Sequence, residues 1–289
     1  MNILMTGGTG FLGRHLLKRF VNRGDKVYVL VRSSSRINSI LEFAYQIKLI
    51  FMESNDLEIV FAKKRIDAIV HCATDYGRSS KNTWQILEPN LILPVKLLEL
   101  ANRYSCSVFF NTDTVLDKRI SDYAMSKAHF NDWLQSFSEN LVAINFRLEH
   151  FYGPGDDITK FVSMAVRIML SKQKRFPLTQ GMQKRDFIYI DDVCDAAVLI
   201  IDKAKDFSNG YYEYEVGSGE LVSIKNLVKL IKELTKSKIE LGFGDIEYRD
   251  NEHMSVSLLN SHLRALGWAP KVSLRDGLIK TIKYEKEIE

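Results

Sequence analysis

The sequence is poor in the residues that mark several protein classes. Its 289 residues include only three cysteines and five prolines. Cys72, Cys106 and Cys194 are too few and too widely spaced for a disulfide framework or a CxxC metal site, so we expect reduced, buried thiols and no metal. Because prolines are rare and repeats and low-complexity tracts are absent, no linker divides the chain into consecutive halves.

An excess of one charge and long apolar runs are also missing. The 40 Lys and Arg against 36 Asp and Glu leave a net charge of +4, which is too small to predict a nucleic-acid partner. No stretch approaches the roughly 18 consecutive apolar residues of a spanning helix. The N-terminus lacks the charged region and cleavage site of a signal peptide. We therefore expect a cytoplasmic protein without membrane insertion.

What the sequence does contain is an alternation of two patterns. Short runs rich in Val, Ile and Phe lie at residues 2–6, 26–32, 68–73, 107–112 and 141–148. Apolar residues at helical spacing lie between them. Alternating strands and helices predict crossover connections and a parallel sheet covered by helices on both faces. The predicted fold class is therefore α/β, with a doubly wound parallel sheet.

After about residue 150 the alternation loosens. The expected elements are a loop at 151–157, helices at 158–171, 222–236 and 272–287, a strand followed by a helix over 185–202, and a strand at 212–216. We predict that residues 151–289 form most of a smaller, interleaved substrate-binding lobe. That lobe would lie at the carboxyl ends of the strands, where ligands of open α/β sheets bind.

The segment "TGGTGFLG" follows the first predicted strand and opens the first predicted helix. In this place Gly7 permits a tight turn, Gly10 lets the backbone approach a pyrophosphate, and Gly13 lets the helix pack close to the sheet. The amides and the dipole of the helix N-terminus would then face the phosphates. A glycine-rich turn without a ligand is the alternative for such a motif alone, but its position favours a dinucleotide.

The second predicted strand ends in "VLVRSSSR", with Arg32, Ser33 and Arg36 and no carboxylate. An acidic residue at this place binds the ribose 2′-hydroxyl of NAD, whereas an arginine accommodates the 2′-phosphate of NADP. We therefore predict NADPH as the cofactor, with Arg14 as a further cation. NADH remains possible if the arginines are solvated surface groups. Residues 1–150, with roughly 186–204, are predicted as the NADP-binding Rossmann domain.

Tyr123 and Lys127 are four residues apart, so their side chains share one face of a helix. A nearby ammonium lowers the pKa of a tyrosine from about 10, which suits proton exchange with an alcohol or ketone. A surface pair on a helix is the alternative for YxxxK alone. Upstream, "FFNTDT" ends a predicted strand with Thr112 and Thr114, either of which could hydrogen-bond a substrate oxygen.

In this order, the motifs TGxxGxxG, "HCAT", "NTDTV", YxxxK, "RLEHFYGPGD", "RDFIYIDDV" and "EVGSG" resemble the extended short-chain dehydrogenase/reductase family, which includes NAD-dependent epimerases and dehydratases. The resemblance covers nearly the whole chain. It implies a Rossmann fold and a nucleotide-diphosphate sugar as substrate, and we expect a homodimer.

By position, the resemblance implies that Tyr123 is the acid/base, that Lys127 is its partner and a ribose ligand, and that Thr112 orients the sugar oxygen. The implied cofactor contacts are Gly7, Gly10, Phe11, Leu12, Gly13 and Ala73. Arg185 and Arg249 would hold the substrate diphosphate, because a guanidinium suits phosphate oxygens. His150 would either hydrogen-bond the substrate or fill space, and Asn90 would support the site.

One departure from the family pattern narrows the reaction. Dehydratases of the family carry an Asp-Glu pair after the threonine, whereas this chain has Asp113 and Thr114, which argues against water elimination. Stretches such as "ATDYGR" and "FGDIEYRDNEHM" are similar to 4-ketoreductases that make CDP-3,6-dideoxyhexoses. The resemblance implies NADPH-dependent reduction of CDP-4-keto-3,6-dideoxyglucose to CDP-abequose or CDP-paratose, for the O-antigen of lipopolysaccharide.

Two alternatives stay open. A nucleotide-sugar 4-epimerase would use the same residues with tightly bound NAD, although an arginine after the second strand argues against it. A non-catalytic dinucleotide sensor would bind the cofactor without turnover, but it would not need Tyr123, Lys127 and a threonine together.

Overall fold

The computed structural model describes residues 1–53, 57–78, 82–248 and 252–288. Its contacts separate two compact units. Unit 1 comprises Met1–Leu148 and Cys194–Glu215, and unit 2 comprises Glu149–Val193 and Val216–Glu289. Residues 186–193, which the sequence analysis grouped with the nucleotide-binding domain, thus fall in unit 2, whereas residues 205–215 fall in unit 1.

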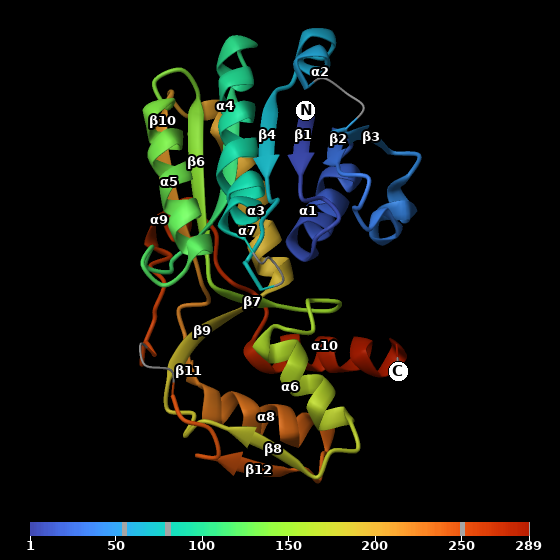
Figure 1. The fold of residues 1–289 in the computed structure, drawn as a ribbon, viewed down its shortest axis with the longest axis vertical. Helices are drawn as coiled ribbons and strands as arrows, with labels where there is room; N and C mark the ends of the chain where they lie inside the picture. The colour runs from blue at the N-terminus through green and yellow to red at the C-terminus, as the bar shows by residue number, and fades with distance from the viewer. Residues whose placement is uncertain (54–56, 79–81, 249–251, 289) are drawn as a thin grey trace. The chain divides into compact units, whose positions relative to one another are not determined.

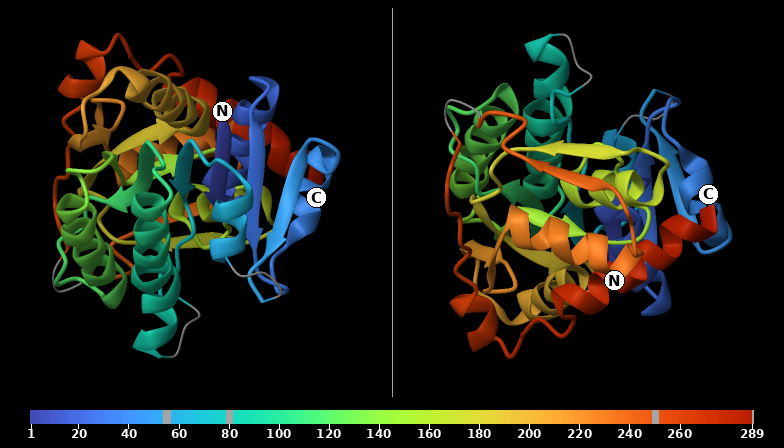
Figure 2. Two further views of the ribbon diagram at one scale, coloured as in Figure 1. Left: turned by 90° about the horizontal axis from the view of Figure 1, so that it is seen from above. Right: turned by 90° about the horizontal axis from the view of Figure 1, so that it is seen from below.

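Unit 1 is built on a seven-stranded sheet in the order β3-β2-β1-β4-β5-β6-β10 (Figure 1). Its strands are β1 (Asn2–Thr6), β2 (Lys26–Val31), β3 (Ile47–Phe51), β4 (Ala68–His71), β5 (Val108–Thr114), β6 (Val142–Leu148) and β10 (Gly210–Val216). The pairings from β3 to β6 are parallel, which confirms the predicted doubly wound α/β fold. β3 lies at one edge, in light blue in the left view of Figure 2.

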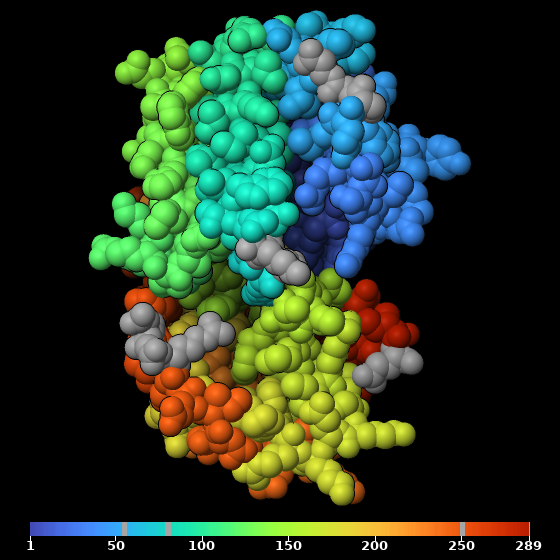
Figure 3. Space-filling model, in the orientation of Figure 1, coloured from blue at the N-terminus to red at the C-terminus, as the bar shows by residue number. Residues whose placement is uncertain are grey.

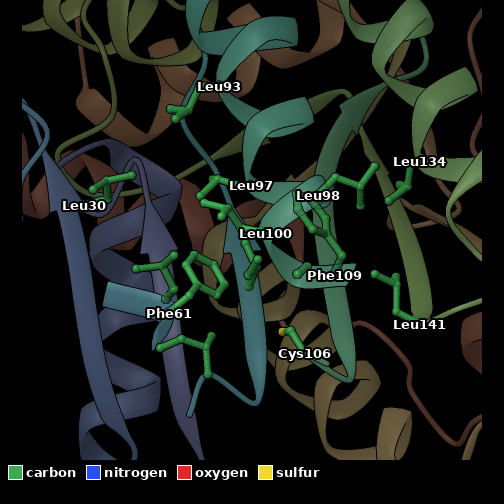
Figure 4. Close-up of a cluster of buried hydrophobic side chains, with 14 of the residues drawn as sticks. Leu30, Phe61, Leu93, Leu97, Leu98, Leu100, Cys106, Phe109, Leu134 and Leu141 are labelled. Atoms are coloured by element: carbon green, nitrogen blue, oxygen red, sulfur yellow. The ribbon is translucent and has the colours of Figure 1, made fainter. Parts of the chain in front are cut away.

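Helical segments connect these strands, and they divide between the two faces of the sheet. They are α1 (Phe11–Asn22), η1 (Ile37–Phe43), α2 (Leu57–Lys63), α3 (Thr83–Leu87), η2 (Glu88–Ile92), α4 (Leu93–Arg103), α5 (Asp122–Ser136), α7 (Ile190–Lys203) and η3 (Ala204–Asp206). Leu97 of α4 and Phe130 of α5 pack on one face in a cluster that includes Phe109 of β5 (Figure 4). On the other face Arg19 of α1 pairs with Asp195 of α7 at 3.4 Å. Figure 3 shows the outer surface of α4 and α5, in teal and green.

The described residues of unit 2 form a three-stranded sheet, a two-stranded sheet and four helices. Its elements are β7 (His150–Tyr152), α6 (Phe161–Leu170), β8 (Arg175–Leu178), β9 (Lys184–Tyr189), β11 (Leu221–Ser223), α8 (Ile224–Thr235), β12 (Glu240–Phe243), α9 (Ser261–Ala265) and α10 (Leu274–Ile288), with the sheets ordered β11-β9-β7 and β12-β8. α6, α8 and α10 confirm three predicted helices.

Two expectations for this half of the chain need correction. The predicted loop at 151–157 begins inside β7, because its first residues pair in parallel with β9. The predicted strand at 212–216, expected in the substrate lobe, forms β10 and extends the large sheet beside β6. Among the described residues, none of the helices has both the length and the apolar character that crossing a membrane requires.

Candidate active site

The glycine-rich turn between β1 and α1 packs against the end of β4. Gly7 has φ +67°, and a Cβ there would lie 2.4 Å from the backbone nitrogen of Ala73. A Cβ on Gly13 would lie 2.0 Å from the Gly7 carbonyl oxygen. The strand order reverses between β1 and β4, where open α/β sheets bind their ligands. The turn is therefore a cradle that only glycine can form.

The N-terminus of α1 opens onto this cradle. Gly10 is its N-cap residue, its first turn carries no acidic side chain, and among the described residues no side chain caps it. Phe11 is partly exposed, whereas Leu12 is buried beneath it. The first amides and the positive end of the helix dipole are thus left for an anion. These residues fit the pyrophosphate of a dinucleotide.

The adenosine end of the predicted cofactor site holds a residue that the sequence analysis missed. Glu53, two residues after β3, accepts hydrogen bonds from the Ser33 backbone nitrogen at 2.9 Å and the Ser33 hydroxyl at 3.2 Å. The bond from the Ser33 backbone is the main cause that lowers the pKa of Glu53. The segment after β2 has no carboxylate, as stated, but β3 pairs with β2 and brings Glu53 beside Ser33 and Arg32.

Thr112, Tyr123 and Lys127 come together at the carboxyl end of β5. The Lys127 side chain is buried, and its Nζ donates a hydrogen bond to the Thr112 carbonyl oxygen at 2.6 Å. Tyr123 lies one turn earlier on α5 and is 9% exposed. Ser121 caps this helix by accepting a hydrogen bond from the Ala124 nitrogen at 3.2 Å. The cap and the lysine contact fix the start of α5 against β5.

The electrostatics of the pair differ from the sequence expectation. Burial raises the pKa of Tyr123 well above its ordinary value, and this outweighs a side-chain hydrogen bond with Thr114 and the charge of Arg78, which both lower it. Burial also lowers the pKa of Lys127, and this outweighs the effect of the Asp113 carboxylate, which raises it. The predicted lowering of the Tyr123 pKa is therefore wrong, because burial raises it.

The sequence allowed either Thr112 or Thr114 to hydrogen-bond the substrate, and the hydroxyl groups of these two residues have different partners. The Thr112 hydroxyl donates to the His71 carbonyl oxygen at 3.0 Å. Since a hydroxyl has one proton to donate, in this rotamer it can only accept a bond from a substrate. The Thr114 hydroxyl instead faces Tyr123. Of the two, Thr114 is the hydroxyl beside the phenol.

Asn90 ties the loop after β4 to α5. It is fully buried in η2, a π-helical segment, and its Oδ1 accepts from the Asp75 nitrogen at 2.9 Å. Its Nδ2 donates to the Asp75 carbonyl oxygen at 2.8 Å and to the Ser126 hydroxyl at 3.1 Å. π-Helical turns often occur at functional sites. These contacts are those of a residue that supports the site.

Three further residues predicted to bind substrate, His150, Arg185 and Arg249, belong to the stretch of the chain assigned to unit 2. In unit 2 the His150 imidazole is 3.1 Å from the Glu149 carboxylate and packs near the Phe187 ring. Arg185 is largely buried and forms an ion pair with Glu252, while its Nη1 donates to the Lys184 carbonyl oxygen at 2.8 Å. Arg249 lies outside the described residues. Within unit 1, the structure brings together Thr112, Tyr123 and Lys127.

The strand order and the glycine cradle define a Rossmann-type dinucleotide-binding protein. Residues 3–217 match the NAD dependent epimerase/dehydratase family. The chain belongs to this family, whose members in the extended short-chain dehydrogenase/reductase group include enzymes that modify nucleotide sugars.

Relatives and solved structures agree with this membership. The chain is 32% identical to CDP-abequose synthase of Salmonella typhimurium, over 97% of each chain. It is 33% identical to CDP-abequose synthase of Salmonella muenchen, over 98% of each. Its fold is similar to the crystal structure of UDP-glucose 4-epimerase from Thermotoga maritima with UDP-glucose, with a TM-score of 0.85, 26% identity and full coverage of both chains.

Proposed function

We propose that this protein is an NADPH-dependent 4-ketoreductase that converts CDP-4-keto-3,6-dideoxyglucose to CDP-abequose or CDP-paratose. The observation that carries the proposal is the placement of a buried Lys127, bonded to the Thr112 carbonyl, one turn after Tyr123. Full-length similarity to CDP-abequose synthases supports the choice of substrate. Thr114 in place of a second acid supports reduction rather than elimination of water.

We assign residues of unit 1 to the steps of this reaction. When bound, NADPH supplies the hydride that reduces C4 of the sugar. Tyr123 donates its phenolic proton to the C4 oxygen as negative charge develops there, and it regains a proton from solvent. Its raised pKa keeps the phenol protonated, as reduction of a ketone requires. Lys127 keeps a positive charge near the reacting oxygen, and Thr114, whose hydroxyl faces Tyr123, positions that oxygen.

Two residues act on the preference for NADPH, one in its favour and one against it. Arg32 follows β2 directly and would accommodate a 2′-phosphate. Glu53 holds the N–H and O–H of Ser33 and would repel that phosphate. We expect Arg32 to prevail because Glu53 is exposed and can exchange its hydrogen bonds from Ser33 for bonds from water.

The test follows NADPH absorbance at 340 nm with the purified protein and CDP-4-keto-3,6-dideoxyglucose. The GDP- and dTDP-linked 4-keto-6-deoxyhexoses run in parallel, and the Tyr123→Phe variant serves as the inactive control. Oxidation with the CDP sugar supports the proposal, and NMR of the product then assigns the configuration at C4. Binding of NADPH without oxidation by any of the three sugars would refute it.

A 4-epimerase is the second candidate, and the similarity to UDP-glucose 4-epimerase favours it. An epimerase returns its hydride, so it would interconvert UDP-glucose and UDP-galactose with no net change at 340 nm. Purification with bound NAD and activity on UDP-glucose would support this candidate over the reductase.

A further inference from the structure

A buried polar network lies on the face of the sheet that α5 covers. On this face Phe109 is apolar and packs against Phe130 of α5. The next inward residues along β5 and β6 are polar: Asn111 and Asn145 are fully buried, and Asn111 Nδ2 donates to Asn145 Oδ1 at 2.8 Å. Burying amides in place of apolar side chains costs free energy unless each group finds a partner. Because of this cost, a polar network in the core indicates a role beyond packing.

Asn145 joins two carboxylates. Its Nδ2 donates to Asp113 Oδ2 at 2.9 Å and to Glu213 Oε2 at 3.1 Å. An amide nitrogen has two hydrogens, so each carboxylate receives one. Burial acts to raise the pKa of Glu213, but the hydrogen bonds from Tyr211, Asn145 and Arg147 outweigh it and lower that pKa. Glu213 therefore remains a carboxylate and an acceptor.

The other end of the network is Asp113, which stands between the two threonines of the site. Its Oδ1 accepts from the Thr114 nitrogen at 2.7 Å, while Oδ2 accepts from Asn145. With both oxygens accepting, the carboxylate is held in one orientation. The preceding residue, Thr112, offers the carbonyl that binds Lys127. Asp113 therefore directly follows the residue that binds the buried lysine.

Among the titratable groups that act on Lys127, Asp113 is the carboxylate. Burial, reinforced by Lys127 itself, lowers the pKa of His71 well below its ordinary value, so the ring is neutral. Burial raises the pKa of the Cys72 thiol to about 12. Asp113 acts on Lys127 from β5, and Glu213 of β10 lies behind Asn145. A buried ammonium needs such a partner to stay charged.

We propose that Asn145 is a positioning residue that orients the Asp113 carboxylate as the counter-ion of Lys127. The proposal rests on the proposed function for its kinetic consequence. Asp113 favours the protonated forms of both Lys127 and Tyr123. Reduction of a ketone requires both protons, so releasing Asp113 lowers both pKa values and moves the alkaline limb of the kcat profile to lower pH.

The experiment compares Asn145→Leu with Asn111→Leu, which removes an amide of the same kind from the same buried face. Asn145→Leu should move the alkaline limb down by up to about one pH unit, the effect of losing an opposite charge completely, because Asp113 keeps its charge but loses its fixed orientation. Asn111→Leu removes the bond to Asn145 Oδ1 but leaves both bonds from Asn145 Nδ2 to the carboxylates, so it should lose thermal stability and keep the limb in place. Asp113→Asn should move the limb at least as far as Asn145→Leu. Equal movement in the two Asn→Leu variants, or none in Asn145→Leu, would overturn the proposal.

A second measurement separates this proposal from the proposed function. In protein labelled with ¹³C at the lysine ε-carbons, the Lys127 signal is assigned by its loss in Lys127→Met and titrated by NMR without any substrate. A lower Lys127 pKa in Asn145→Leu supports the counter-ion role even if the CDP sugar is not reduced. An unchanged Lys127 pKa in a folded Asn145→Leu protein refutes it even if the sugar is reduced.

Discussion

The close packing of the glycine cradle predicts how much stability a substitution at Gly13 would cost. In Gly13→Ala the new Cβ starts 2.0 Å from the Gly7 carbonyl oxygen, whereas ordinary contact begins at 3.4 Å. The neighbour is backbone in a tight turn, so the turn must open rather than a side chain rotate. Overpacking costs about 1–3 kcal/mol, and we expect the upper end. For a domain of this size, about 3 kcal/mol lowers Tm by about 6–12 °C.

Binding should suffer as well, because opening the turn displaces the first amides of α1. We expect the Kd for NADPH to rise about 100-fold, or about 2.8 kcal/mol. Fluorescence titration measures the Kd, and a thermal melt of the same sample measures Tm. A Gly13→Ala protein that binds NADPH like the parent and melts at the same temperature would refute the close approach. A lower Tm with unchanged Kd would show that the dinucleotide binds elsewhere.

The matched control is Gly24→Ala, at the other end of α1. Gly24 has φ +85°, and among the described residues no atom lies within 4 Å of the added Cβ. Only the left-handed backbone opposes this change, at a cost of about 1–2 kcal/mol. The Kd for NADPH should not change. The contrast between the two variants isolates the effect of the clash.

Three further predictions concern the site. Tyr123→Phe should lower kcat by about 1000-fold while the Kd for NADPH is unchanged, and near-normal turnover would remove Tyr123 as the acid. Thr114→Val should lower kcat more than Thr112→Val, because the Thr112 proton is committed to a backbone carbonyl; steady-state kinetics with the CDP sugar decide, and the reverse order would restore Thr112 as the donor. Arg32→Asp should shift the ratio of NADPH to NADH affinity toward NADH, and Glu53→Gln should shift it toward NADPH; unchanged ratios would remove both residues from cofactor selection.

The sequence predicted those parts of the fold that depend on local pattern. β1, β2, β4, β5 and β6 each contain a short apolar run because both faces of the sheet are covered. β3 escaped notice since three of its five residues are exposed at the sheet edge. β7 and β11 have three residues each, too few for a period to emerge.

In the site, the sequence predicted the residues that carry motifs and missed those that meet through pairing. Tyr123 and Lys127 are four residues apart on one helix, so their proximity follows from the sequence. Glu53 is 20 residues from Ser33 and meets it only because β2 and β3 pair in register. Asn145 and Glu213 are 68 residues apart. No local pattern links such residues, and the rotamer of Thr112 is likewise set by the neighbouring strand.

The interleaving of the two units has a consequence for synthesis on the ribosome. β6 ends at Leu148, but its neighbour β10 begins only at Gly210, after the chain has made much of unit 2. Until then the outer edge of β6 presents unpaired amides and carbonyls, which other chains can join. A gene truncated after residue 148 would fix the nascent chain in that state, so it should yield aggregates. A fusion of 1–148 to 194–215 supplies the missing strand.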